Sequence, residues 1–525
     1  MGFYTYDRKE RQINNMDTIV VLDFGSQYSH LICRRIREAN VYCELLPYNT
    51  PARVLKEIKP KGIIFSGGPA SVYSKDSPKP DKKVFQLGFP ILGICYGHQI
   101  IIDNFGGKIK KTIGREYGRA DLVIDDKSDL FGSMDNKIKC WMSHSDTAEK
   151  LPEGFEILAH TRNSFSAAIG NRKKKFYGIQ FHPEVAHTQK GTEILMNFSQ
   201  NISRAKPNWN MESFIELTIK DLRSAIGNDR VLCAVSGGID STTLAALLHR
   251  AIGDNLLCVF VNHGLLREDE ESLVVNLFER QLGIKVIYID ASKQFLQRLK
   301  GVDDPERKRK IIGEEFAKVF VDIAKKNGPF QWLAQGTLYP DVIESGVSKG
   351  PAVVIKTHHN VGGLPKWLNL KVIEPLSSLY KDEVRKVAKL LCVPDEFLKR
   401  HPYPGPGLAV RIIGEVTDEK IRIVRHASKI VEDELTAAGL YNKIWQAYAA
   451  VGNDRAVGVL GDERVYGHIV VIRVVESLDA MTADWTRLPY DLIETISNRI
   501  TNEIEDVTWV TYVVSSKPPA TIEPQ

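Results

Sequence analysis

Short apolar runs alternate with helix-length amphipathic stretches in the N-terminal part of the chain. These runs have the length and composition of buried strands, at residues 18–22, 62–65, 90–94 and 176–181. Glycine-rich or acidic turns follow the first three, and a helical pattern over residues 193–202 follows the fourth. The rhythm predicts an α/β fold, and the polar segment 203–210 marks its end.

A second α/β unit follows, with strands expected at residues 231–235, 256–261 and 285–289. Helix-length stretches separate these strands, and crossovers of that length connect parallel strands. The segment His-Pro-Tyr-Pro-Gly-Pro-Gly at 401–407 ends the unit, because its prolines cannot continue a helix. Strands at 467–474 and 508–514, mixed with helices, predict a smaller domain after it. We therefore divide the chain into a leader at 1–16 and domains at 17–206, 207–402 and 403–525.

The composition is that of an ordinary globular protein. Hydrophobic residues make up 43% of the 525 positions and charged residues 26%, which excludes a disordered or fibrous chain. The formal net charge of +5 predicts neither a nucleic-acid partner nor a membrane partner. The seven cysteines form no C-x-x-C pair, and no apolar run approaches the ~20 residues of a membrane span. We expect a cytoplasmic protein, for which phosphorylated small molecules remain possible ligands.

The segment Gly-Ile-Cys-Tyr-Gly at 93–97 joins an apolar strand to a helix. Its glycines permit a turn so tight that the thiol of Cys95 would stand exposed at the helix N-terminus, as at the nucleophile elbow of hydrolases. Backbone N–H groups at that end of a helix favour the thiolate, which is the reactive form. A free cysteine taken alone is more often a small buried apolar residue. The two flanking glycines favour the nucleophile.

A base for this thiol is available in Phe-His-Pro-Glu at 181–184. In an extended chain His182 and Glu184 can share a face, with the carboxylate orienting the imidazole. Alone, His182 would be an ordinary turn histidine, but together with Cys95 it predicts a Cys-His-Glu triad. Ser-Gly-Gly-Pro at 66–69 either ends a strand in a plain turn or presents backbone N–H groups to a developing oxyanion.

In this order and at these separations, the three segments resemble the class I glutamine amidotransferases. The resemblance implies that Cys95 attacks the side-chain amide of glutamine and that ammonia is released. It makes His182 the base and Glu184 its orienting partner. It also implies oxyanion-hole amides at Gly67 and Tyr96 and a contact of Gln99 with substrate glutamine.

A strand, a glycine-rich turn and a helix start occur again at 231–242, where residues 236–242 are Ser-Gly-Gly-Ile-Asp-Ser-Thr. The N–H groups of such a helix terminus bind anions, and the hydroxyls of Ser236, Ser241 and Thr242 add donors, so phosphate is the expected ligand. A lone Gly-Gly would more often be a tight turn capped by Asp240 or Ser241. No G-x-x-x-x-G-K-[ST] segment stands here, which disfavours a Walker-type P-loop.

The full segment resembles the PP-loop of the ATP pyrophosphatases, which cleave ATP between its α and β phosphates and adenylylate a substrate oxygen. The resemblance places Lys381 near the pyrophosphate, and it implies Mg²⁺ held by the ATP phosphates and Asp240. The implied ATP-binding residues of the loop are Ser236, Gly237, Gly238, Ile239, Asp240, Ser241 and Thr242.

An amidotransferase joined to a PP-loop domain resembles the glutamine-hydrolysing GMP synthetases, from about residue 17 to residue 523. Motifs specific to that family stand at 261–267, 308–313, 334–345, 356–361, 401–407 and 517–523. The resemblance implies that ammonia from glutamine displaces AMP from an adenylylated xanthosine monophosphate (XMP), which gives GMP. It implies an α/β fold of three parts: an open mixed sheet flanked by helices, a doubly wound parallel sheet, and a small α+β domain that pairs two chains into a homodimer. The implied XMP-binding residues are Arg309, Asp341, Gln446, Arg499, Lys517, Thr521 and Glu523.

Several of these acceptor residues have ordinary explanations when taken singly. Lys517 precedes two prolines and could belong to a stiff exposed tail, and Arg499 could lie on a solvated helix face. Asp341 follows Pro340 and could cap a helix instead of binding the purine or ribose. The family resemblance selects the binding role in each case.

The chain departs from the family pattern at three places. His98 stands where the family often has methionine, and the ending Pro524-Gln525 replaces an aromatic and acidic one. Ser145 replaces a glycine, and its β-carbon could alter a glycine-dependent backbone angle near bound glutamine. Two other functions stay open at this point: an adenylylating amidotransferase with a carboxylate acceptor, and a nucleotide-sensing binding protein.

Overall fold

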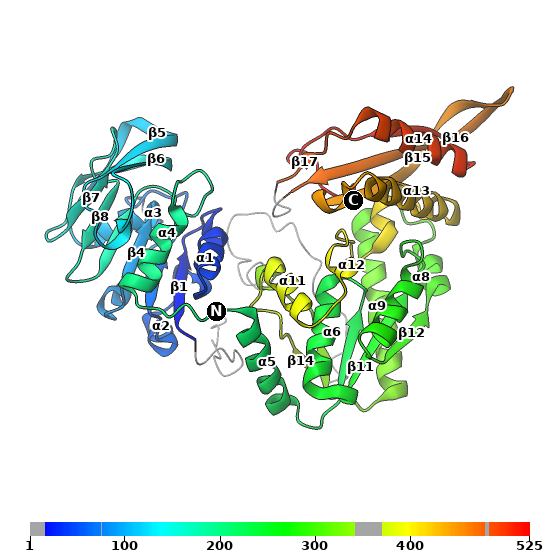
Figure 1. The fold of residues 1–525 in the computed structure, drawn as a ribbon, viewed down its shortest axis with the longest axis horizontal. Helices are drawn as coiled ribbons and strands as arrows, with labels where there is room; N and C mark the ends of the chain where they lie inside the picture. The colour runs from blue at the N-terminus through cyan, green and yellow to red at the C-terminus, as the bar shows by residue number, and fades with distance from the viewer. Residues whose placement is uncertain (1–15, 75, 342–369, 478–481) are drawn as a thin grey trace. The chain divides into compact units, whose positions relative to one another are not determined.

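The computed structural model describes residues 16–74, 76–341, 370–477 and 482–525. The chain divides into two compact units, Met1–Leu217 and Thr218–Gln525, each with its own sheets and helices (Figure 1). The leader up to residue 15 and the motif residues 342–345 and 356–361 lie outside the described residues. The three predicted domain boundaries stay predictions.

The first unit is built on a nine-stranded mixed sheet of order β2-β1-β3-β4-β9-β8-β7-β5-β6. The strands from β2 to β9 in this order run parallel, and the remaining pairs are antiparallel. The bounds are β1 Thr18–Asp23, β2 Tyr42–Pro47, β3 Gly62–Phe65, β4 Ile91–Ile94, β5 Lys108–Ile124, β6 Lys137–Lys150, β7 Glu156–His160, β8 Ala168–Asn171 and β9 Phe176–Ile179. The expected open mixed sheet is confirmed.

Helices cover this sheet because its central strands are apolar on both faces. All residues of β3 and β4 are buried, as is usual for parallel strands between helices. The helices are α1 Ser29–Glu38, α2 Ala52–Ile58, α3 Tyr96–Asn104 and α4 Gly191–Met196, with a π-helical turn at Asn197–Ile202. The helix α5, Met211–Ile226, leads into the second unit.

Two sequence predictions in this unit need correction. Strand β9 ends at Ile179, two residues earlier than expected, because the backbone there leaves its neighbours and the N–H of His182 donates to the carbonyl of Trp141 in β6 at 3.0 Å. The helix expected over 193–202 starts earlier, at Gly191, and widens into a π-helix from Asn197.

The second unit contains a five-stranded parallel sheet of order β12-β11-β10-β13-β14, which confirms the predicted parallel sheet. Its strands are β10 Val231–Val235, β11 Leu256–Asn262, β12 Val286–Asp290, β13 Trp332–Ala334 and β14 Lys371–Ile373. Its helices are α6 Ile239–Ile252, α7 Glu270–Asn276, α8 Ser292–Leu299, α9 Pro305–Asn327, α11 Lys381–Leu390 and α12 Asp395–Leu398.

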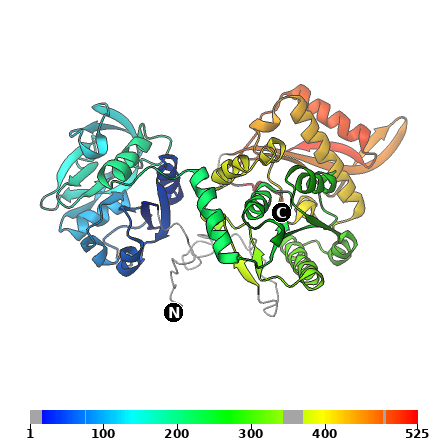
Figure 2. The ribbon, with the colours of Figure 1, turned by 60° about the horizontal axis from the view of Figure 1, so that its bottom comes forward.

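The C-terminal part of this unit forms the expected α+β arrangement. Strands β15 Gln446–Leu460, β16 Glu463–Glu476, β17 Asp484–Trp485 and β18 Val507–Tyr512 form a four-stranded sheet, with α13 Asp418–Ala437 and α14 Tyr490–Glu503 beside it. One apolar core runs through both sheets of the unit, from Leu232 in β10 to Ile472 in β16. The C-terminus lies among the helices and strands of the unit (Figures 1 and 2).

The proline- and glycine-rich segment 401–407 packs against the turn after β11. Gly407 has φ +63°, and a β-carbon there would lie 2.4 Å from the carbonyl oxygen of Leu265. The N–H of Leu408 donates to the same carbonyl at 2.9 Å. The segment therefore approaches the turn after β11 so closely that only glycine is permitted at position 407.

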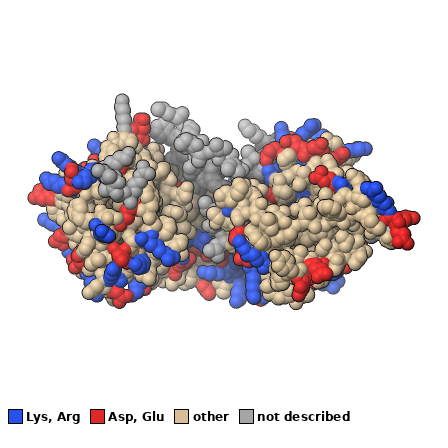
Figure 3. Space-filling view, turned by 90° about the horizontal axis from the view of Figure 1, so that it is seen from above, with Lys and Arg blue, Asp and Glu red and all other residues tan. Residues whose placement is uncertain are grey.

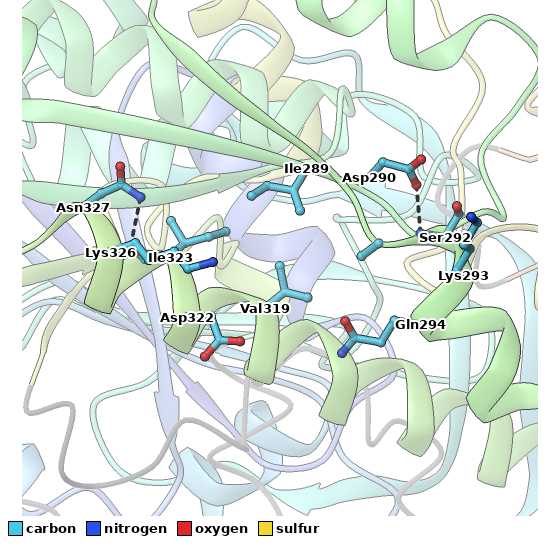
Figure 4. A pocket seen from close by; sticks show the side chains of 11 residues that line it. Ile289, Asp290, Ser292, Lys293, Gln294, Val319, Asp322, Ile323, Lys326 and Asn327 are labelled. Atoms are coloured by element: carbon cyan, nitrogen blue, oxygen red, sulfur yellow. Dashed lines mark hydrogen bonds between the residues drawn. The ribbon is translucent and has the colours of Figure 1, made fainter.

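A cavity of about 510 Å³ lies beside β12, between the start of α8 and the second half of α9 (Figure 4). Its polar lining includes Asp290, Ser292, Gln294, Asp322 and Lys326. None of the predicted ATP-binding or XMP-binding residues lines it. Across the described ranges, no helix combines the length and the apolar character needed to cross a membrane.

Candidate active sites

Cys95 lies at the sharp turn that the sequence predicts. It joins β4 to α3 with φ +53°, a strained value for a residue with a side chain. A β-carbon on Gly93 would lie 2.3 Å from the carbonyl oxygen of Gly97, and one on Gly97 would lie 2.4 Å from that of Phe65. Both glycines are therefore required for the turn.

The thiol of Cys95 is not exposed as expected, because the residue is only 6% exposed. Its Sγ donates to the carbonyl oxygen of Ser143 at 3.7 Å, and Nε2 of Gln180 approaches the sulfur at 3.8 Å. These groups enclose the thiol, and Gln180 is a contact that the sequence analysis missed. The turn therefore places the thiol of Cys95 in an enclosed position.

The structure brings His182 and Glu184 together beside this thiol. Nδ1 of His182 is 2.7 Å from Oε1 of Glu184, which has no exposed surface. Burial by itself would lower the pKa of His182, but the charge of Glu184 and hydrogen bonds with Cys95 and Glu184 raise this pKa well above its ordinary value. The hydroxyl of Thr188 donates to the carbonyl of His182 at 2.6 Å and fixes its backbone. The imidazole is therefore suited to hold a proton next to the sulfur.

Backbone donors and an amide side chain lie around the same thiol. A β-carbon on Gly67 would lie 3.1 Å from Cε1 of His182 and 3.7 Å from Cβ of Cys95, so only a glycine leaves this side of the site open. Tyr96 is the first residue of α3, and its N–H has no partner within the helix. Gln99, one turn along the helix, donates to the carbonyl of Asp146 at 3.2 Å.

A buried polar network contacts the same carbonyl of Asp146 as Gln99. Nε2 of His144 is 3.3 Å from the carboxylate of Glu116, and Nδ1 of His144 is 3.1 Å from the carbonyl of Asp146. Glu116 belongs to no local motif and was not predicted from the sequence. Ser145 lies in β6 and is absent from the described residues with positive φ, so the expected conflict with a glycine-dependent angle does not arise.

His98 fills space behind the nucleophile. A β-carbon on Gly178 would lie 2.4 Å from its Nδ1, so the ring packs directly on β9. Burial, and to a smaller extent the nearby His144, lowers the pKa of His98 to about 3, so the imidazole is neutral at physiological pH. A neutral, buried ring can replace a methionine at this position without adding charge to the site.

The predicted phosphate loop connects β10 to α6. Gly237 has φ +72°, and Gly238 is the N-cap of α6, which no side chain among the described residues caps. The alternative of a turn capped by Asp240 or Ser241 is therefore not found. The hydroxyl of Ser241 accepts from the N–H of Ser236 at 3.1 Å and holds the loop in shape. The open helix terminus can accept an anion.

Asp240 and Lys381 form an ion pair beside this loop, with Nζ 3.2 Å from Oδ2. The other carboxylate oxygen, Oδ1, is buried and has no hydrogen-bond partner among the described residues. Thr242 differs from the exposed Ser236, because it is fully buried and its hydroxyl also lacks a partner among these residues. Asp240 thus retains a free oxygen for a cation.

Three of the predicted acceptor residues come together at the end of the chain. Nε2 of Gln446 donates to Oε1 of Glu523 at 2.6 Å, and the hydroxyl of Thr521 donates to the carbonyl of Glu523. Lys517 is placed by backbone hydrogen bonds with Ala483, at 2.7 and 3.2 Å. The tail that the sequence analysis singled out is therefore ordered by contacts along its length.

Arg411, the cation at the centre of this cluster, was not predicted from the sequence. It is 2% exposed and pairs with both carboxylate oxygens of Glu523, at 3.2 and 3.0 Å. Burial alone would lower the pKa of Arg411, but the charge of Glu523 raises it above its ordinary value. Arg411 lies four residues beyond the 401–407 motif, and nothing in the local sequence indicates that it pairs with Glu523.

The remaining predicted acceptor residues lie elsewhere or have other partners. Arg499 on α14 pairs with Glu434 at 2.9 Å and Glu503 at 2.6 Å rather than with the residues around Glu523. Arg309 on α9 pairs with Glu306 of the preceding turn at 2.6 Å. The carboxylate of Asp341 accepts from the N–H of Leu338 at 3.0 Å.

Three family models match the chain at these features. The model of class-I glutamine amidotransferases matches residues 20–202, and that of the PP-loop domain matches residues 211–310. The model of the GMP synthase C-terminal domain matches residues 433–524. Fold, sites and matched segments together define a class-I glutamine amidotransferase joined to a PP-loop ATP-binding domain.

Similar proteins cover nearly the whole chain. A GMP synthase [glutamine-hydrolyzing] of Gloeothece citriformis is 52% identical over 97% of this chain and 95% of its own. Proteins of the same name from Synechocystis sp. and Caldicellulosiruptor saccharolyticus are each 53% identical, over 98% and 97% of this chain and 96% and 99% of theirs. The chain belongs to the family of glutamine-hydrolysing GMP synthases. It is an enzyme that forms GMP in a glutamine-dependent, ATP-using reaction on small-molecule substrates.

Proposed function

We propose that Cys95, His182 and Glu184 hydrolyse glutamine and that the PP-loop unit uses the released ammonia to convert XMP into GMP. The observation that carries this proposal is the strained, enclosed Cys95 at the N-terminus of α3, next to a histidine bound to a buried carboxylate at 2.7 Å. A structural cysteine needs neither the positive φ nor the charged histidine.

In the glutaminase half-reaction, the sulfur of Cys95 attacks the carboxamide carbon of glutamine. The N–H groups of Gly67 and Tyr96 stabilise the negative charge that develops on the carbonyl oxygen. His182 gives its proton to the departing ammonia, and Glu184 holds the imidazole in position. Water then cleaves the thioester with His182 as base, which releases glutamate and restores the thiol.

In the synthetase half-reaction, the loop from Ser236 to Thr242 binds the ATP phosphates and Lys381 neutralises part of their charge. The purine C2 oxygen of XMP attacks the α-phosphorus, and pyrophosphate leaves. Ammonia then adds to C2 and AMP leaves, which gives GMP. XMP would be held by the predicted acceptor residues Arg309, Asp341, Gln446, Arg499, Lys517, Thr521 and Glu523.

The oxygen donors beside the loop fit Mg²⁺, which prefers carboxylate, hydroxyl and phosphate oxygens. Oδ1 of Asp240 is buried without a partner among the described residues, and Ser241 lies one residue further along the same helix. Asp240 would hold the ion together with the ATP phosphates. When bound, the ion screens the phosphate charge against the attacking oxygen.

Replacing Cys95 with alanine separates the two half-reactions. The variant should lose GMP formation from glutamine and retain it from added ammonium, with XMP and ATP present in both assays. Equal loss of both activities would contradict the division of labour. A matched control is Cys392→Ala, because Cys392 is exposed and lies in the other unit.

We further propose a cytoplasmic homodimer that pairs through the C-terminal domain. All seven cysteines are free, as a reducing compartment allows. Val459, Tyr466 and Trp509, on neighbouring strands of the C-terminal sheet, are 71, 64 and 54% exposed. In the view of Figure 3, charged side chains of this unit gather around a broad uncharged area. Exposed apolar side chains of this kind favour contact with a second copy.

A further inference from the structure

Four side chains of the second unit alternate between arginine and tyrosine in one continuous stack. The guanidinium of Arg267 lies 4.5 Å from the ring centre of Tyr403, and that of Arg411 lies 5.0 Å from the same ring. Arg411 also lies 4.4 Å from the ring centre of Tyr448. We call Arg267, Tyr403, Arg411 and Tyr448 the cation–π ladder. Its members come from three separate parts of the chain.

One end of the ladder reaches the phosphate loop through Glu270. This carboxylate is 3% exposed, and its Oε1 would lie 3.3 Å from a β-carbon on Gly237 in the loop. Oε1 pairs with Arg400 at 2.8 Å, and Oε2 lies 4.0 Å from Nη1 of Arg267. Arg267 is also held by the carbonyl of His401, to which its Nη2 donates at 2.8 Å. One buried carboxylate thus lies beside the loop glycine and also faces Arg267, the first rung.

The other end of the ladder reaches the C-terminal tail. Arg411 pairs with both carboxylate oxygens of Glu523, and the hydroxyl of Tyr448 donates to the carbonyl of Ile522 at 2.5 Å. Gln446 donates to the same carboxylate at 2.6 Å. Two of the predicted acceptor residues, Glu523 and Gln446, are therefore linked to Arg411, and Tyr448 holds the backbone next to Glu523.

Tyr403, which lies between the two arginines, has a hydrogen bond of its own. The hydroxyl of Tyr403 donates to the carbonyl of Leu265 at 2.7 Å, in the turn between β11 and Arg267. Tyr403 is the only member of the ladder that contacts an arginine on each side among the described residues. Removing its ring would leave the half-buried Arg267 and the fully buried Arg411 facing a gap.

The arginines of this stack depend on carboxylates at both of its ends. Moving Glu270 with the loop would leave Arg400 without an anion among the described residues and Arg267 with only Glu432, which lies 3.8 Å from its Nε. Moving Glu523 with the tail would leave the buried Arg411 without an anion among these residues. Uncompensated buried charge is costly, so a displacement at one end favours a matching displacement at the other. The ladder is a physical connection between the two ends.

We propose that Glu270 and Tyr403 are positioning residues that couple occupancy of the phosphate loop to the conformation of the acceptor-binding tail. The inference rests on the proposed function, since it takes the loop as the ATP site and the tail as part of the XMP site. Glu270 and Tyr403 act through the arginines that they hold.

The test is a coupling ratio measured by titration calorimetry on the full-length protein. XMP affinity is measured with Mg²⁺ alone and with Mg²⁺ plus an ATP analogue whose α–β bridge is a methylene group. In the wild type the analogue should tighten XMP binding about 5- to 150-fold, the range usual for coupled sites. In Tyr403→Leu this ratio should fall to about 1, while Tyr403→Phe, which keeps the ring, should retain most of it. Tyr490→Leu, at an 89% exposed tyrosine, is the matched control and should keep the wild-type ratio.

The same ratio must be obtained when the analogue is titrated with and without XMP, because coupling is reciprocal. Glu270→Gln provides a second route if Tyr403→Leu does not fold, and it should lower the ratio without removing a ring. A wild-type ratio near 1, or an unchanged ratio in Tyr403→Leu or Glu270→Gln, would overturn the inference. A wild type that binds neither ligand would instead refute the proposed function, so the two failures are distinguishable.

Discussion

Glu184→Gln tests the proposed triad with the smallest change in shape. Glutamine keeps the size of glutamate but removes the charge from a position with no exposed surface, 2.7 Å from Nδ1 of His182. Its amide nitrogen can donate to Nδ1, and the imidazole proton then moves to Nε2, the nitrogen left for the thiol. In that tautomer His182 cannot accept the proton of Cys95.

The expected loss follows from the role of the third triad member. The comparable substitution in the Ser-His-Asp triad lowers kcat by about 10⁴ through the wrong tautomer. Here a fall of about 10²- to 10⁴-fold in glutaminase kcat is expected, equivalent to about 3–5 kcal/mol. GMP formation from added ammonium should be unchanged, since the charge lies in the first unit.

The pH dependence gives a second readout. In the wild type Glu184 raises the pKa of His182 against the effect of burial. Without this charge burial dominates and the pKa falls, so the imidazolium loses its proton at lower pH. The alkaline limb of the glutaminase profile should therefore move to lower pH in Glu184→Gln.

Glu193→Gln, at an exposed glutamate of α4 in the same unit, is the matched control and should behave as the wild type. Glutaminase activity in Glu184→Gln comparable to that of the wild type, with an unmoved alkaline limb, would refute the role of the carboxylate. A loss of ammonium-dependent synthesis as well would point to misfolding rather than to the triad.

Three further substitutions test other parts of the structure. Gly237→Ala places a β-carbon at φ +72° and 2.3 Å from Cγ2 of Val274, so urea unfolding should show a loss of at least about 1 kcal/mol and the KM for ATP should rise. Nζ of Lys308 lies 2.8 Å from the side-chain amide oxygen of Gln525, and burial lowers the pKa of this lysine to about 8. Gln525→Glu places a carboxylate beside it. Below about pH 8 the buried lysine is charged, which destabilises the folded state, and the new carboxylate offsets this cost. The gain in melting temperature should therefore be largest between about pH 5 and 8 and shrink at higher pH, where the lysine loses its charge. Trp509→Lys should shift a dimer toward monomer in sedimentation, and an unchanged sedimentation coefficient would count against this interface.

The parts of the fold with local signals could be predicted from the sequence. Strand β3 occupies residues 62–65 as predicted, since a continuous apolar run between turn residues is typical of a strand buried on both faces. Strands β5 and β6 were not predicted, because they are long and antiparallel and β6 alternates between buried and exposed residues rather than forming an apolar run.

The functional residues also differ in whether a local sequence pattern marks them. Cys95 and the phosphate loop stand on strand–turn–helix segments whose glycines give a local signature. The contact of Arg411 with Glu523 joins residues 112 positions apart and carries no such signature. Its partner Tyr403 lies in a motif that the sequence analysis identified, but which rings and cations meet depends on the packing of two sheets into one core.

The proposed reaction builds the nitrogen released from glutamine at Cys95 into GMP. The most direct measurement supplies the full-length protein with XMP, ATP, Mg²⁺ and glutamine labelled with ¹⁵N at the side-chain amide. GMP should carry the label, form in equal amounts with AMP and pyrophosphate, and depend on Cys95. Glutamate that accumulates while XMP stays unchanged, or GMP without the label, would contradict the proposed reaction.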